Sequence, residues 1–129
     1  MSQKHTALVV DDDPGSRRLL ARWLEEEGWS VIEAASGQMA LSRAREKEPD
    51  LVLLDIRMPG FLDGLRVSEV LSENPALQAV PIIAVSASPQ ETFRHQALAA
   101  GCSGFLSKPV NFKELREEIA RLLPAGKRG

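Results

Sequence analysis

The fold is decided by residues 51–64, Leu51-Val-Leu-Leu-Asp-Ile-Arg-Met-Pro-Gly-Phe-Leu-Asp-Gly64. Four apolar residues run directly into the carboxylate of Asp55, and Met58-Pro59-Gly60 predicts a turn shortly afterwards. An unbroken apolar run bounded by turn residues is typical of a strand buried on both faces of a parallel sheet. In such sheets functional groups lie just beyond the carboxyl ends of the strands. We therefore expect Asp55 at a position where chemistry can occur.

Length and composition indicate one globular domain in a reducing compartment. The 129 residues are enough to form a hydrophobic core that needs no disulfide or structural metal for stability. A net charge of -2 gives no electrostatic reason to expect binding to nucleic acid or to an anionic membrane. The single cysteine, Cys102, cannot form an intramolecular disulfide. No apolar run approaches transmembrane length, and the first residues do not resemble a signal peptide. We expect a cytoplasmic domain over residues 1–123, with 124–129 a tail or the start of a linker.

The rest of the chain alternates strand and helix patterns. Apolar runs predict strands at 7–10, 31–32, 51–55, 81–85 and 104–107. Helix patterns follow each run, with start signals at Asp13, Ser36, the Ser88-Pro89-Gln90-Glu91 capping box and Asn111. In the first helix Leu19, Leu20, Trp23 and Leu24 form an apolar stripe. Five such alternations predict an α/β fold, with a parallel sheet covered by helices on both faces.

Polar residues with related chemistry follow these strands. They are Asp11, Asp12 and Asp13 after the first strand, Asp55 after the third, Ser86 after the fourth and Lys108 after the fifth. The carboxyl ends of parallel strands meet at one edge of the sheet, so we expect these carboxylates to lie close together. Because like charges repel, such a cluster requires a cation. A site that offers only oxygen ligands favours Mg²⁺. A lysine and a hydroxyl nearby suit a phosphoryl group. The chemistry predicted is an aspartyl phosphate on Asp55.

Four motifs carry a family resemblance over nearly the whole chain. They are Val9-Val10-Asp11-Asp12-Asp13-Pro14, residues 53–60 around Asp55, Ala84-Val85-Ser86-Ala87, and Gly104-Phe105-Leu106-Ser107-Lys108-Pro109. Together they resemble the receiver domain of two-component response regulators, of the chemotaxis-regulator type. The resemblance implies a (βα)₅ flavodoxin-like, doubly wound sheet of five parallel strands. It also implies phosphorylation by a partner histidine kinase or phosphotransfer protein, and a monomer or weak dimer.

The resemblance also implies a role for each matching residue. Asp55 would accept the phosphoryl group, Ser86 would be the switch hydroxyl, Lys108 would pair with the phosphoryl group and Phe105 would be the aromatic switch. The Mg²⁺ ligands would be Asp12 directly, Asp11 mainly through water, Asp55 and the backbone carbonyl of Arg57. A downstream protein or domain would read the fourth helix, fifth strand and fifth helix. No enzyme activity is implied beyond Mg²⁺-dependent self-phosphorylation and autodephosphorylation.

One feature departs from the family pattern, and Arg57 near Asp55 is open to more than one interpretation. Phe61 and Leu62 stand where the family usually has one residue, so the loop is one residue longer. The two side chains either pack against the domain or serve in partner docking or as a lid. Arg57 either extends into solvent, or reaches the phosphoryl group or obstructs water near it.

Two other functions remain as alternatives. A phosphohydrolase of the haloacid-dehalogenase type would use Asp11 and Asp13 as its Asp-x-Asp pair, but it needs a further acidic motif after Lys108 and leaves Asp55 unexplained. A docking module that is never phosphorylated would keep the fold, although the acidic pair, Ser86 and Lys108 argue against it.

Overall fold

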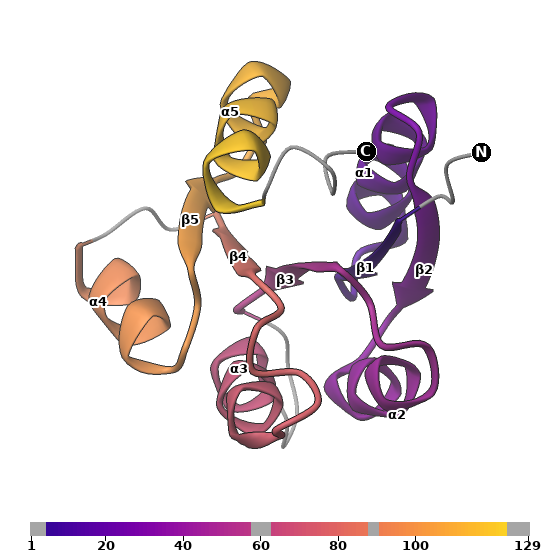
Figure 1. Ribbon diagram of the computed structural model, residues 1–129. Coiled ribbons are helices and arrows are strands. Elements are labelled where there is room, and N and C mark those ends of the chain that lie inside the picture. The colour runs from indigo at the N-terminus through magenta and orange to yellow at the C-terminus, as the bar shows by residue number, and fades with distance from the viewer. Residues whose placement is uncertain (1–4, 58–62, 88–90, 124–129) are drawn as a thin grey trace.

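The computed structural model describes residues 5–57, 63–87 and 91–123 (Figure 1). The predicted turn at Met58-Pro59-Gly60, the loop residues Phe61 and Leu62, residues 88–90 of the predicted capping box and the tail 124–129 lie outside the described residues.

Strands and helices alternate along the described chain. The strands are β1 (Thr6–Val10), β2 (Ser30–Ala34), β3 (Leu51–Asp55), β4 (Ile82–Ser86) and β5 (Gly104–Ser107). The helices are α1 (Pro14–Glu26), α2 (Gly37–Lys47), α3 (Gly64–Glu73), α4 (Glu91–Ala99) and α5 (Phe112–Leu122). The predicted order is confirmed, although β2 extends beyond the two apolar residues that indicated it.

All four strand pairings are parallel, and the strand order is β2-β1-β3-β4-β5. Val10 pairs with Leu54, and Asp55 pairs with Val85. The carboxyl ends of β1, β3 and β4 therefore lie side by side, which places Asp11, Asp55 and Ser86 at one edge.

The sheet separates two hydrophobic clusters, as expected for strands buried on both faces. Alternate residues point to opposite sides: Val9 and Leu53 pack with α1 and α5, whereas Val10 and Leu54 pack with α2 and α3. In Figure 1 the sheet is seen with α1 and α5 above it and α2 and α3 below it. The central strands are thus covered by helices on both faces of the sheet.

Four helices start where a side chain caps them. Asp13, Ser36, Asp63 and Asn111 each accept a hydrogen bond from the backbone N–H three residues later. The predicted apolar stripe of α1 was wrong at Leu19, which is 59% exposed, while Leu20 and Leu24 are buried. The buried face is centred on Leu20, Ala21 and Leu24, so Leu19 falls on its flank.

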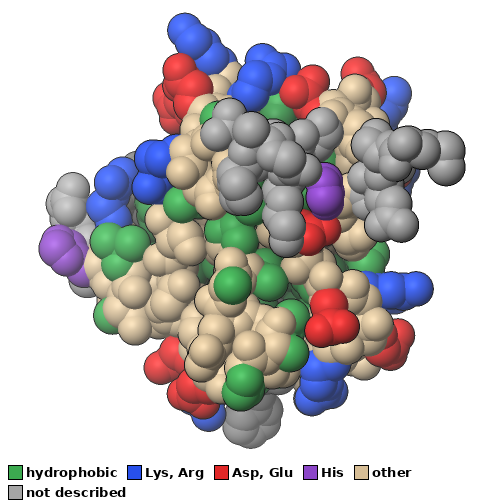
Figure 2. Space-filling view, in the orientation of Figure 1, with side chains coloured by type: hydrophobic (Ala, Val, Ile, Leu, Met, Phe, Trp, Pro, Cys, Tyr) green, Lys and Arg blue, Asp and Glu red, His purple; other side chains and the backbone are tan. Residues whose placement is uncertain are grey.

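Among the described residues, no helix combines the length and apolar character needed to cross a membrane. On the face seen in Figure 2, acidic and basic side chains are interspersed.

Candidate functional site

Three carboxylates meet at the carboxyl edge of the sheet. Asp11 and Asp12 directly follow β1, and Asp55 is the last residue of β3. One oxygen from each lies within 4.8 Å of the others, and Asp11 and Asp55 are buried while Asp12 is exposed. The structure therefore brings together three of the predicted metal ligands.

Lys108 reaches this cluster from the end of β5. Its Nζ donates to Asp11 Oδ2 at 2.8 Å and to Asp55 Oδ2 at 3.3 Å. Partial burial lowers the pKa of Lys108, but the bond to Asp11 and the charge of Asp55 outweigh it, so the pKa is raised above its ordinary value. Lys108 is therefore a fixed positive charge beside both carboxylates.

The negative charge of Asp55 is less well compensated by its neighbours than that of Asp11. Burial raises its pKa, and the amide of Arg57, which donates to Asp55 Oδ1 at 2.9 Å, and Lys108 only partly compensate. The charge of Asp11 adds to the rise, so the pKa of Asp55 stays above its ordinary value. The arrangement favours a cation, or a group held by cations, beside Asp55.

Asp11 is held in a single orientation. Its Oδ1 accepts the amide N–H of Asp13 at 2.9 Å, and its Oδ2 is bound to Lys108. Burial raises the pKa of Asp11, but the bonds from Lys108 and Asp13 outweigh this, so the pKa is lowered. Asp13 itself caps α1 and does not belong to the carboxylate cluster.

The two predicted switch residues lie on neighbouring strands. Ser86 is the buried last residue of β4, and its carbonyl accepts the amide of Lys108 at 2.8 Å. Phe105, in β5, is half-buried against the cluster on the α3 side, and the guanidinium of Arg94 from α4 lies 5.5 Å from its ring centroid. Their roles stay predictions, as does the carbonyl ligand predicted at Arg57, whose side chain is exposed.

Sequence reasoning did not find Arg17. Its Nη1 donates to the backbone carbonyl of Asp11 at 2.8 Å, and its Nε donates to Glu33 in β2 at 3.0 Å. No local pattern marks an arginine on α1 as a neighbour of the carboxylate edge, because the contact depends on how α1 crosses the sheet.

The donor set fits Mg²⁺. The carboxylate oxygens are hard ligands, gathered from two adjacent strand ends, and one of the three carboxylates is exposed to solvent, which leaves room for the waters that Mg²⁺ keeps. The predicted roles of Asp12 as a direct ligand and of Asp11 as a ligand mainly through water stay predictions, and the structure shows that hydrogen bonds already hold the side chain and backbone of Asp11.

The comparisons with known proteins agree with this geometry. The family model of the response regulator receiver domain matches residues 7–120. The chain belongs to this family. Receiver domains function in two-component signalling, bind Mg²⁺ at an acidic pocket and are in general not enzymes in their own right. The match places the chain with receiver domains rather than with the alternative phosphohydrolases.

Individual relatives show where such domains occur. The chain is 35% identical over 116 residues to Protein PilH of Pseudomonas aeruginosa, covering 90% of this chain and 95% of PilH. It is 35% identical over 119 residues to the signal transduction histidine-protein kinase BarA of Escherichia coli K12, covering 92% of this chain but only 13% of BarA. The structure of the chemotaxis protein CheY4 of Vibrio cholerae superposes with a TM-score of 0.88 at 26% identity, covering 94% of this chain and 100% of that chain.

Proposed function

We propose that this receiver domain accepts a phosphoryl group on Asp55 from a phosphohistidine of a partner kinase or phosphotransfer protein. One observation carries the proposal: the Asp55 carboxylate, at the end of β3, lies close to the carboxylates of Asp11 and Asp12 and to the ammonium of Lys108. In the transfer an Asp55 oxygen forms the new P–O bond, the P–N bond to the histidine breaks, and the leaving imidazole takes a proton from solvent. Bound Mg²⁺ would neutralise the charge on the phosphoryl oxygens.

The residues around Asp55 support distinct parts of this step. Lys108 would hold a phosphoryl oxygen, because its ammonium already lies beside Asp55. The amide of Arg57 fixes one carboxylate oxygen, so the acceptor is oriented before the donor arrives. Asp11 and Asp12 would supply the metal ligands.

The switch would follow from new bonds to the phosphoryl group. Phosphorylation adds nearly two negative charges and three acceptor oxygens. Ser86 and Lys108 would both bond these oxygens, and the movement of Ser86 would let Phe105 turn inward. Moving a population from mostly inactive to mostly active needs about 5 kcal/mol, which two or three charge-assisted hydrogen bonds toward the upper end of about 1.5–3 kcal/mol each would supply.

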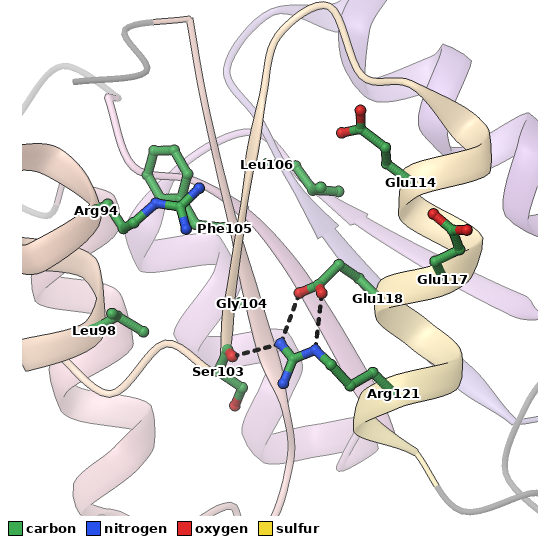
Figure 3. A pocket seen from close by; sticks show the side chains of 10 residues that line it. All are labelled: Arg94, Leu98, Ser103, Gly104, Phe105, Leu106, Glu114, Glu117, Glu118 and Arg121. Atoms are coloured by element: carbon green, nitrogen blue, oxygen red, sulfur yellow. Dashed lines mark hydrogen bonds and ion pairs between the residues drawn. The ribbon is translucent and has the colours of Figure 1, made fainter. Parts of the chain in front are cut away.

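The surface that would report the switch surrounds Phe105. A hollow of about 420 Å³ lies over β5 between α4 and α5, and Figure 3 shows Arg94 beside the Phe105 ring on one side and the acidic side chains of α5 on the other. Arg121 closes the lower end, where it bonds Glu118 and the carbonyl of Ser103. Loss of the Arg94–Phe105 contact on inward movement would change the shape of this surface, which a downstream protein or domain would read.

The donor protein would dock beside Lys108. An apolar groove of about 460 Å³ runs between α1 and the segment after β5, and it is lined by Leu19, Ala87, Lys108 and Phe112 among others. Leu19 stands exposed there. The groove is continuous with the site through Lys108, so a protein bound in it would hold its phosphohistidine near Asp55.

Intact-mass analysis tests the chemistry. Incubation with Mg²⁺ and a small phosphodonor should add one phosphoryl group, which Asp55→Asn and omission of Mg²⁺ should both abolish. If no adduct accumulates, a beryllofluoride titration followed by NMR distinguishes fast hydrolysis from a domain that is never phosphorylated. An adduct that survives Asp55→Asn but is lost in Asp11→Asn would overturn the proposal.

A further inference from the structure

Arg17 connects three elements at the carboxylate edge. From α1 its Nε donates to Glu33 Oε1 in β2 at 3.0 Å, and its Nη1 donates to the carbonyl of Asp11 after β1 at 2.8 Å. The Arg17 side chain is only 17% exposed, whereas that of the neighbouring Arg18 is 57% exposed. A half-buried guanidinium with two fixed acceptors is held in one orientation, since its planar fork loses little freedom for each bond it makes.

These contacts fix the backbone of Asp11 on both sides. The N–H of Asp11 donates to the carbonyl of Ala34 at 3.1 Å, and the carbonyl of Asp11 accepts from Arg17. The Asp11 carboxylate is separately held by the Asp13 amide and Lys108. Rotation of this peptide would displace the carboxylates of Asp11 and of Asp12, which follows it directly. The bond from Arg17 opposes such a rotation.

Glu33 orients the guanidinium. Its two carboxylate oxygens bind separate arginines, Oε1 taking Arg17 and Oε2 taking Arg18. The negative charge of Glu33 also offsets the positive charge that Arg17 brings toward a cation site. Arg18 binds the second carboxylate oxygen of Glu33, whereas the hydrogen bond to the Asp11 carbonyl comes from Arg17.

We propose that Arg17, oriented by Glu33, is a positioning residue for the Mg²⁺ site: it holds the Asp11–Asp12 turn in the geometry that binds the ion. The inference rests on the proposed function for the identity of the ion. It assigns to Arg17 no contact with the phosphoryl group, and it concerns how well the ligands are arranged before the ion binds. Groups that orient metal ligands in this way commonly change metal affinity when they are removed.

The test is a Mg²⁺ titration of the metal-free domain, followed by NMR at a temperature where every variant is folded. Arg17→Met should raise the dissociation constant for Mg²⁺ about tenfold, the lower end for a group that orients ligands. Arg18→Met is the matched control, because it removes a neighbouring arginine with the same partner, and it should leave the constant unchanged.

The direction of the change separates positioning from charge and from stability. If Arg17 acted only as a nearby cation, its removal would tighten Mg²⁺ binding, because like charges repel. If it only stabilised the fold, the unfolding midpoint would fall and the dissociation constant would stay the same. Either result would overturn the proposal while leaving the proposed function intact. A wild-type protein that binds no Mg²⁺ would instead contradict the proposed function.

Variants of Glu33 test whether the two residues act as a unit. Glu33→Gln keeps an acceptor for Arg17 Nε and should bind Mg²⁺ nearly as well as the wild type, whereas Glu33→Ala should weaken binding as Arg17→Met does. The double variant Arg17→Met/Glu33→Ala should be no weaker than either single variant, because coupled residues are not additive. Additive losses would show that the residues act separately. Should Arg17→Met fail to fold, Glu33→Ala against Glu33→Gln carries the test.

Discussion

Gly64 lies directly against the backbone of Asp55: a Cβ built on Gly64 would stand 2.3 Å from the Asp55 carbonyl oxygen. It would also stand 2.3 Å from the Cα of Ile56. Backbone atoms cannot rotate out of the way as a side chain can, so α3 begins beside the end of β3 only because its first residue has no side chain. The close packing of α3 against the backbone that carries the Asp55 carboxylate thus depends in part on a glycine.

We predict that Gly64→Ala lowers the free energy of unfolding by about 1–3 kcal/mol, the usual cost of forcing an added methyl group into a packed site. Urea denaturation measures it. Gly15→Ala is the control, because a Cβ there would meet only Asp13 Oδ2, at 3.9 Å. Equal unfolding midpoints for the two variants would contradict the close approach.

A second prediction concerns the bond between Lys108 and Asp11. Lys108→Met should cost about 2 kcal/mol of stability near neutral pH, the range for hydrogen bonds to charged groups. The pKa of Asp11 is lowered in the folded protein, so its stabilisation is present above the ordinary aspartate pKa and is lost as pH falls through the lowered value. Denaturation at several pH values should show the difference between wild type and variant shrinking as the pH falls below the ordinary aspartate pKa. A constant difference would indicate that only the lysine stem packs there.

The third prediction is that Asp55→Asn stabilises the metal-free domain at neutral pH. The pKa of Asp55 is raised, chiefly by burial and also by the charge of Asp11, so its ionised form costs stability above that pKa. The gain should disappear as pH falls and Asp55 takes up a proton. Saturating Mg²⁺ should reverse the order, because only the wild type keeps the third carboxylate. Thermal unfolding with and without Mg²⁺ measures both effects, and Glu69→Gln on the exposed side of α3 serves as a neutral control.

The fourth prediction separates docking from chemistry. Leu19→Glu should slow phosphorylation by any kinase that phosphorylates the wild type, since it places a charge in the apolar groove beside Lys108. Labelling by a small phosphodonor should be unaffected. Met39→Glu on α2 changes another exposed apolar side chain and should slow neither reaction. Equal loss with both donors would mean that Leu19 supports the site rather than a partner.

The proximity of Asp11, Asp55 and Lys108 could be predicted from the sequence because it depends only on the alternation of strands and helices along the chain. Once strands are known to be parallel, whatever follows them lies at one edge. The spacing of apolar residues does not determine how wide a strip of the helix surface the rest of the protein covers. Leu19 was therefore wrongly placed in the buried apolar stripe.

Other contacts depend on distances that no local pattern encodes. The Arg17–Glu33 pair requires β2 to lie beside β1 with α1 crossing above them. The need for glycine at position 64 arises from the approach of α3 to β3. Both are consequences of tertiary packing, and they became visible only in three dimensions.

Because the core is divided into two clusters, the intrinsic tryptophan fluorescence of the protein comes from one side of the sheet only. The chain has two tryptophans and no tyrosine, and both Trp23 and Trp29 belong to the cluster beside α1 and α5, where Trp23 stacks on Phe112 at 5.2 Å between ring centroids. Phe105 belongs to the opposite cluster. The tryptophan fluorescence of the wild-type protein would therefore change when a donor protein binds at α1. The variant Phe105→Trp would add a second fluorophore on the side of α4. Stopped-flow recordings of the two proteins would then time docking and switching as separate events.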